Sequence, residues 1–98
     1  MTLDKQIQQI KTKIMPILKK YGVNKAAVFG STVRGEATAD SDVDVLVELP
    51  SNKGLLVFIA LKYELEDALG KSVDLVEYTT IHPLLKSEIL EEQVLILQ

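Results

Sequence analysis

The fold is decided by one stretch, residues 30–48, which reads GSTVRGEATADSDVDVLVE. Near its end Asp42 and Asp44 open an apolar run that extends from Val43 to Leu49. Side chains two positions apart on a strand point to the same face, so the two aspartates are expected to lie together while the valines turn the other way. Two adjacent carboxylates repel each other unless a positive charge lies between them. The spacing therefore predicts a site for a hard divalent cation, which prefers carboxylate and phosphate oxygens.

The first half of the stretch has the features that a phosphate group requires. An apolar run from Ala26 to Phe29 leads directly into Gly30 and Ser31. Glycine permits a tight turn and a close approach of the backbone, and the serine adds a hydroxyl where a short helix is expected to begin. The bland interpretation is a strand end followed by a helix N-cap. The combined pattern is Gly-Ser, ten residues, and then Asp-x-Asp.

Length and composition are typical of one globular domain. The chain has 98 residues, of which 47% are hydrophobic and 26% are charged, and we expect a single domain over residues 1–98. It has no cysteine, which excludes disulfides and thiolate metal sites. A net charge of −3 argues against nucleic acid as the main partner. The N-terminus does not resemble a signal peptide and no apolar run is long enough to span a membrane, so a cytoplasmic location is expected.

The hydrophobic periodicity predicts an α/β fold with a small mixed sheet of three or four strands. We expect helices to pack on one face of this sheet and the carboxylates to line the other, open face. The expected helices and strands are, in chain order, a helix over residues 3–20, a strand Val23–Phe29, a helical turn Thr32–Gly35, a strand Asp42–Leu49, a helix Leu55–Leu69, a strand Ser72–Tyr78, a helix Pro83–Glu92 and a strand Val94–Leu97.

Two of the expected helices carry further predictions. The helix Leu55–Leu69 is apolar nearly all round in its first half, which is more than one face can bury in a small domain. Part of this helix is therefore expected to contact a partner chain. In the last helix, Leu84, Leu85, Ile89 and Leu90 are expected to form the inner side.

Three other residues require a choice between functional and structural roles. Asp74 lies on the same strand face as Val76, and it is either a third carboxylate of the site or a gatekeeper at a sheet edge. Arg34, the only arginine, suits a phosphate or a loop anchor, and the alternative is a charge paired with Asp40 or Glu36. His82 is the only histidine, so a zinc site is not supported and a loop position before a helix is the simpler interpretation.

The motif as a whole resembles the nucleotidyltransferase superfamily that includes DNA polymerase beta, and most closely its minimal nucleotidyltransferases. The resemblance covers essentially the whole chain. The matching residues are Gly30, Ser31, Arg34, Gly35, Ser41, Asp42 and Asp44, with the run Val73–Val76 downstream. It implies that Asp42, Asp44 and Asp74 hold two magnesium ions, and that Gly30 and Ser31 cradle the triphosphate. It further implies that Asp74 assists deprotonation of the acceptor.

The resemblance also implies a reaction and a partner. Minimal nucleotidyltransferases are commonly paired with a HEPN-type ribonuclease toxin, and act as antitoxins by transferring AMP from ATP to a tyrosine of that toxin. A chain of this length has no room for a separate acceptor-recognition domain, which agrees with an acceptor supplied by a second protein. Two alternatives stay open: an enzyme that modifies a small molecule, as the aminoglycoside nucleotidyltransferases do, and a non-catalytic antitoxin that neutralises its partner by binding.

Overall fold

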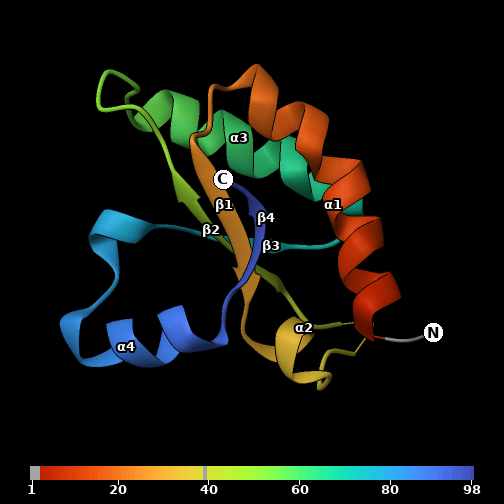
Figure 1. The fold of residues 1–98 in the computed structure, drawn as a ribbon. Coiled ribbons are helices and arrows are strands. Elements are labelled where there is room, and N and C mark those ends of the chain that lie inside the picture. The colour runs from red at the N-terminus through yellow and green to blue at the C-terminus, as the bar shows by residue number, and fades with distance from the viewer. Residues whose placement is uncertain (1–2, 39) are drawn as a thin grey trace.

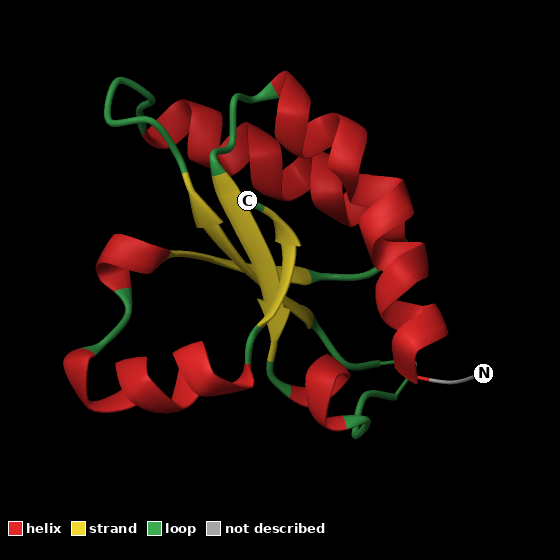
Figure 2. Cartoon of the chain, viewed as in Figure 1, coloured by secondary structure: helices red, strands yellow, loops and turns green. Residues whose placement is uncertain are grey.

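Four strands form one mixed sheet in the computed structural model of the chain (Figures 1 and 2). The structure describes residues 3–38 and 40–98. Positions 1 and 2 of the expected domain, and position 39 in the loop that follows the first motif, lie outside the described residues. The strands are β1 (Lys25–Phe29), β2 (Val43–Glu48), β3 (Val73–Glu77) and β4 (Val94–Leu97), and they lie in the order β3-β2-β1-β4.

The pairing of the strands makes the sheet mixed. The first strand, β1, runs antiparallel to both of its neighbours, β2 and β4, whereas β2 and β3 are parallel. Parallel neighbours require a crossover connection, and α3 (Leu55–Leu69) provides it. The expected α/β class with a small mixed sheet is therefore confirmed.

One face of the sheet is covered by α1 (Leu3–Lys20) and α3 (Figure 1). Alternate residues of β2 and β3 turn toward these helices, as the period of two predicts. Each fully buried aliphatic side chain in this layer contributes roughly 1.5 to 3 kcal/mol. The buried residues of this core are Ile7, Ile14, Leu18, Val23, Ala26, Val28, Val43, Val45, Val47, Leu61, Leu65, Val73, Leu75 and Ile96.

The last helix, α4 (Pro83–Glu92), differs from the expected layering. It lies on the opposite side of the sheet from α1 and α3 and approaches the strands with its C-terminal end (Figure 1). There Ile89 and Leu90 pack against a small cluster of Ala27, Leu46 and Ile81. The carboxylate face is thus partly covered by a helix instead of being open along its whole length.

The expected inner side of α4 is half wrong. Leu84 and Leu85 are 86% and 50% exposed, because only the last turns of this helix reach the sheet. A short 3₁₀ helix, Tyr78–Thr80, precedes α4 and was not expected. The other elements agree with their expected ranges to within one or two residues at each end, with Asp42 lying just before β2. Within residues 3–38 and 40–98, no helix combines the length and the apolar character that crossing a bilayer requires.

Candidate active site

Gly30 connects β1 to the short helix α2 (Ser31–Arg34), and its backbone lies against the side chain of Asp44. Its φ angle is 74°, a conformation that glycine adopts without strain. A Cβ atom added here would lie only 2.1 Å from Oδ2 of Asp44. The backbone of Gly30 does approach another group closely, but that group is a carboxylate of the second motif, and the approach to a phosphate stays a prediction.

The three predicted carboxylates come from the ends of two neighbouring strands. Asp44 and Asp74 are direct partners in the parallel register of β2 and β3, and Asp42 lies one residue before β2. Asp44 is half-buried, whereas Asp42 and Asp74 are exposed. The structure therefore places Asp74 beside the Asp-x-Asp motif, as a third carboxylate of the site would be.

Asp44 has the most perturbed carboxyl group of the site. Its pKa is raised from 3.8 to about 6, chiefly by burial and further by the negative charges of Asp74 and Asp42. The positive charge of Arg34 acts in the opposite direction, and a hydrogen bond with Asp74 favours the protonated form. Such a group gains from a nearby cation, which would stabilise its ionised form.

The carboxylates have the oxygen donors that a divalent cation prefers, but they are not arranged as a preformed metal site. Among the residues that the structure describes, no three histidine, cysteine, aspartate or glutamate side chains converge as a ready-made metal cage. The pair Asp44 and Asp74, with Asp42 close enough to affect its charge, nevertheless offers only hard oxygen donors. Magnesium is commonly bound in this way, by one or two carboxylates together with water and substrate phosphates.

Arg34 lies at the end of α2 and makes two ion pairs. Its Nη1 donates to both carboxylate oxygens of Glu92, each at 3.0 Å, and its Nε donates to Glu36 Oε1 at 3.1 Å. The alternative pairing with Glu36 is thus observed. Glu92 Oε1 also accepts a hydrogen bond of 2.5 Å from the backbone amide of Gly30.

Glu92 is the residue that sequence reasoning missed. It lies in the last turn of α4, 58 positions from Arg34, and nothing in its local pattern separates it from Glu91. Only the tertiary placement of α4 brings it to Gly30 and Arg34. Its side chain is 19% exposed, so the carboxylate is mostly shielded from solvent.

The N-cap interpretation of Ser31 is wrong, because Ser31 is the first residue of α2 and the N-cap is Gly30, with no side-chain cap hydrogen bond. The carbonyl of Gly30 accepts from the amides of the next turn. Ser41 and His82 have the local roles that were expected. The hydroxyl of Ser41 accepts from the amide of Thr38 at 2.9 Å, which is the arrangement of a turn residue. His82 caps α4, with Nδ1 accepting from the amide of Leu84 at 3.1 Å.

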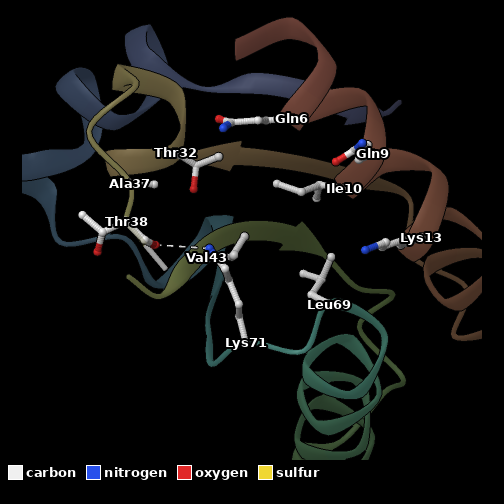
Figure 3. A pocket seen from close by; sticks show the side chains of 10 residues that line it. All are labelled: Gln6, Gln9, Ile10, Lys13, Thr32, Ala37, Thr38, Val43, Leu69 and Lys71. Atoms are coloured by element: carbon white, nitrogen blue, oxygen red, sulfur yellow. Dashed lines mark hydrogen bonds between the residues drawn. The ribbon is translucent and has the colours of Figure 1, made fainter. Parts of the chain in front are cut away.

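A pocket of about 330 Å³ lies on the other side of β2 from the carboxylates (Figure 3). Val43 lines it, and this side chain points away from Asp42 and Asp44 because successive strand residues alternate. Figure 3 also shows Lys71, whose Nζ donates to the carbonyl of Thr38 at 3.2 Å. The pocket is therefore separate from the candidate active site. Its lining residues are Gln6, Gln9, Ile10, Lys13, Thr32, Ala37, Thr38, Val43, Leu69 and Lys71.

Carboxylates from neighbouring strands, a glycine-serine turn and an arginine meet at one end of the sheet. This combination is typical of enzymes that transfer phosphate-containing groups, because carboxylates hold divalent cations while backbone amides and guanidinium groups bind phosphate oxygens. The class of protein that the fold and the site define is thus a phosphate-group transferase.

Comparison with known proteins identifies the family. The model of the nucleotidyltransferase domain family matches residues 11–96. A provisionally named protein adenylyltransferase of Methanocaldococcus jannaschii is 54% identical over 88 residues, which cover 90% of this chain and 95% of that protein. The protein adenylyltransferase MntA of Thermococcus cleftensis is 45% identical over 76 residues, which cover 78% of this chain and 77% of MntA.

Solved structures show the same fold. A provisionally named minimal nucleotidyltransferase superposes with a TM-score of 0.80 at 34% identity, over 96% of this chain and 95% of its own. An MNT antitoxin solved with a tri-AMPylated HEPN toxin of Shewanella oneidensis has a TM-score of 0.70 at 21% identity, over 91% of this chain and 70% of the other. The present chain therefore belongs to the nucleotidyltransferase domain family, among its minimal nucleotidyltransferases, and is a nucleotidyltransferase enzyme.

Proposed function

We propose that this enzyme transfers AMP from ATP to a tyrosine hydroxyl of a HEPN-type ribonuclease toxin and thereby acts as its antitoxin in the cytoplasm. The adenylyl group is supported by relatives named protein adenylyltransferase that are up to 54% identical. The toxin is supported by the MNT antitoxin of the same fold, which was solved with an AMPylated HEPN toxin. The observation that carries the proposal is the placement of Asp44 beside both Asp74 and Gly30.

In this proposal the residues divide the work of binding and chemistry. Asp42, Asp44 and Asp74 would hold magnesium, which neutralises phosphate charge when bound. Gly30, Ser31 and Arg34 would position the triphosphate. The acceptor oxygen bonds to the α-phosphorus while the bond from that phosphorus to the bridging oxygen breaks. The hydroxyl proton passes to Asp74, which is exposed on the reacting face, and pyrophosphate leaves.

The test uses the full chain together with its HEPN-type partner. The partner is incubated with the enzyme, ATP and magnesium, and its intact mass is then measured. We expect a mass increase that corresponds to one or more AMP groups, located on tyrosine by peptide sequencing. The Asp42→Asn and Asp44→Asn double variant serves as the control and should leave the mass unchanged.

The same measurement separates the two alternatives. Inhibition of the toxin without any mass increase would identify a non-catalytic antitoxin. AMP transfer to an aminoglycoside, with an unmodified protein partner, would identify a small-molecule enzyme. Either result would overturn the proposed acceptor.

A further inference from the structure

The carboxylate of Glu92 occupies two donors that the triphosphate would use. It accepts from the amide of Gly30 at 2.5 Å and from Nη1 of Arg34 at 3.0 Å. We propose that Glu92 is an internal competitor of the nucleotide, which must leave these donors before the triphosphate can bind. This inference rests on the proposed function, because it assigns Gly30 and Arg34 to phosphate binding.

The hydrogen-bond count leaves the amide of Gly30 without a free hydrogen for a phosphate oxygen. The backbone amide of Gly30 has one hydrogen, and Glu92 Oε1 accepts it. Both oxygens of Glu92 face the same guanidinium nitrogen of Arg34, while Nε of Arg34 is held by Glu36. A carboxylate and a phosphate present oxygen acceptors of the same kind to a guanidinium. A phosphate oxygen that takes the amide of Gly30 therefore has to displace Glu92.

The negative charges near Gly30 also oppose binding of the triphosphate while Glu92 is in place. Gly30 is in contact range of the Asp44 carboxylate, and Asp44 in turn lies beside Asp74. A triphosphate bound here would add negative charge to a site that already holds these carboxylates. Glu92 in its present position would repel that charge, since like charges at short distance disfavour each other.

The anchoring of α4 allows Glu92 to leave without unfolding the helix. Ile89 and Leu90 pack against the sheet, and Gln93 Oε1 accepts a hydrogen bond of 2.6 Å from the hydroxyl of Tyr78. These contacts hold the C-terminal end of α4 independently of Glu92. A rotation of the Glu92 side chain is therefore sufficient to free both donors.

A simpler role for Glu92 is to hold Arg34 in position for the nucleotide. The two roles predict opposite changes in affinity when the negative charge is removed. If Glu92 competes with the nucleotide, removing its charge strengthens nucleotide binding. If Glu92 positions Arg34, removing its charge weakens that binding.

The deciding experiment measures the affinity of the full chain for ATP with magnesium by calorimetry. We expect Glu92→Gln to bind about tenfold more tightly than wild type, equivalent to roughly 1.4 kcal/mol. The matched control is Glu91→Gln, which removes the same charge from the neighbouring, exposed residue. An unchanged or weaker affinity in Glu92→Gln, or an equal gain in both variants, would overturn the proposal.

A second measurement needs no variant, in case Glu92→Gln does not fold. The side-chain carboxyl carbon signal of Glu92 is followed by NMR in the wild type with and without ATP and magnesium. Competition predicts that this signal shifts on binding toward that of a carboxylate in water, and an unchanged signal would contradict it. Both readouts need only nucleotide binding. Binding without AMP transfer would therefore overturn the proposed function alone, while absence of any binding would overturn both.

Discussion

Asp44 and Asp74 face each other across the parallel strands β2 and β3, so that two carboxylates share the sheet face opposite to α1 and α3. The partial burial of Asp44 raises its pKa most, and the repulsion from Asp74 raises it further. This arrangement opposes folding in the absence of a cation. A site that binds a cation and phosphates explains this arrangement, because functional sites commonly hold groups with perturbed pKa values.

The first prediction concerns stability and pH without divalent cations. The pKa of Asp44 is about 6 in the folded protein and 3.8 as its ordinary value, so the folded state holds this proton more tightly. The contribution of Asp44 to the free energy of unfolding is therefore fully present below pH 3.8 and is lost as the pH rises through about 6. Asp44→Asn should be more stable than wild type at pH 7.5 by about 1 kcal/mol, a value reduced for solvent screening.

This prediction is checked by urea unfolding of both proteins, with EDTA present, at pH 7.5 and near pH 4. The difference in the free energy of unfolding should shrink at the lower pH. A constant difference at both pH values would show that the gain from Asp44→Asn is not electrostatic.

The second prediction concerns magnesium. A cation that binds only the folded state raises the melting temperature, so magnesium should stabilise the wild type and have little effect on Asp44→Asn. AMP transfer should be lost in Asp42→Asn and in Asp44→Asn while both remain folded. Asp67→Asn, which removes a carboxylate from α3 on the other face, should respond to magnesium as the wild type does. An equal response in all these variants would disprove the metal assignment.

The third prediction separates two glycines that share a φ of 74° but differ in ψ, which is −149° at Gly30 and 18° at Gly35. Gly30 and Gly35 both have a φ of 74°, but an added Cβ would meet Asp44 only at Gly30 and nothing within 4 Å at Gly35. Gly35→Ala should lose roughly 1 to 2 kcal/mol from left-handed strain. Gly30→Ala should lose about 1 to 3 kcal/mol more. The added Cβ overpacks against Asp44, and the φ and ψ of Gly30 together lie in a region that almost only glycine adopts. Nucleotide binding should be lost with it.

Urea unfolding of the two glycine variants measures this difference directly. Equal losses of stability would mean that the side chain of Asp44 moves aside easily. In that case the close approach of Gly30 would not be a constraint on the site.

The fold and most of the site could be predicted because their signals are local. The alternation of Val43, Val45 and Val47 fixes the face of β2, and the spacing of Asp42 and Asp44 fixes their common direction. The pairing of Arg34 with Glu92 could not be predicted in this way. It joins residues 58 positions apart, and it depends on how α4 settles on the sheet. The exposure of Leu84 also depends on the placement of α4, because only the C-terminal end of this helix packs against the sheet.

The apolar face of α3 carries the last prediction. Neither Val57 nor Phe58 is an outward residue of this helix, because Phe58 packs against the main core and Val57 is half-buried. A charge at Phe58 would therefore destabilise the fold. The large hydrophobic residues of α3 that are exposed are Leu55, Leu56, Ile59 and Tyr63, with Leu56 at 82%.

We expect Leu56→Glu to keep its melting temperature and ATP affinity but to block AMP transfer to the protein acceptor. An exposed position tolerates the charge, whereas an apolar contact with a second protein does not. The matched control is Leu84→Glu, which makes the same change at an equally exposed residue of α4, on the other side of the sheet. Transfer rates to the acceptor are compared for both variants. Full transfer by Leu56→Glu and loss by Leu84→Glu would move the docking surface from α3 to α4.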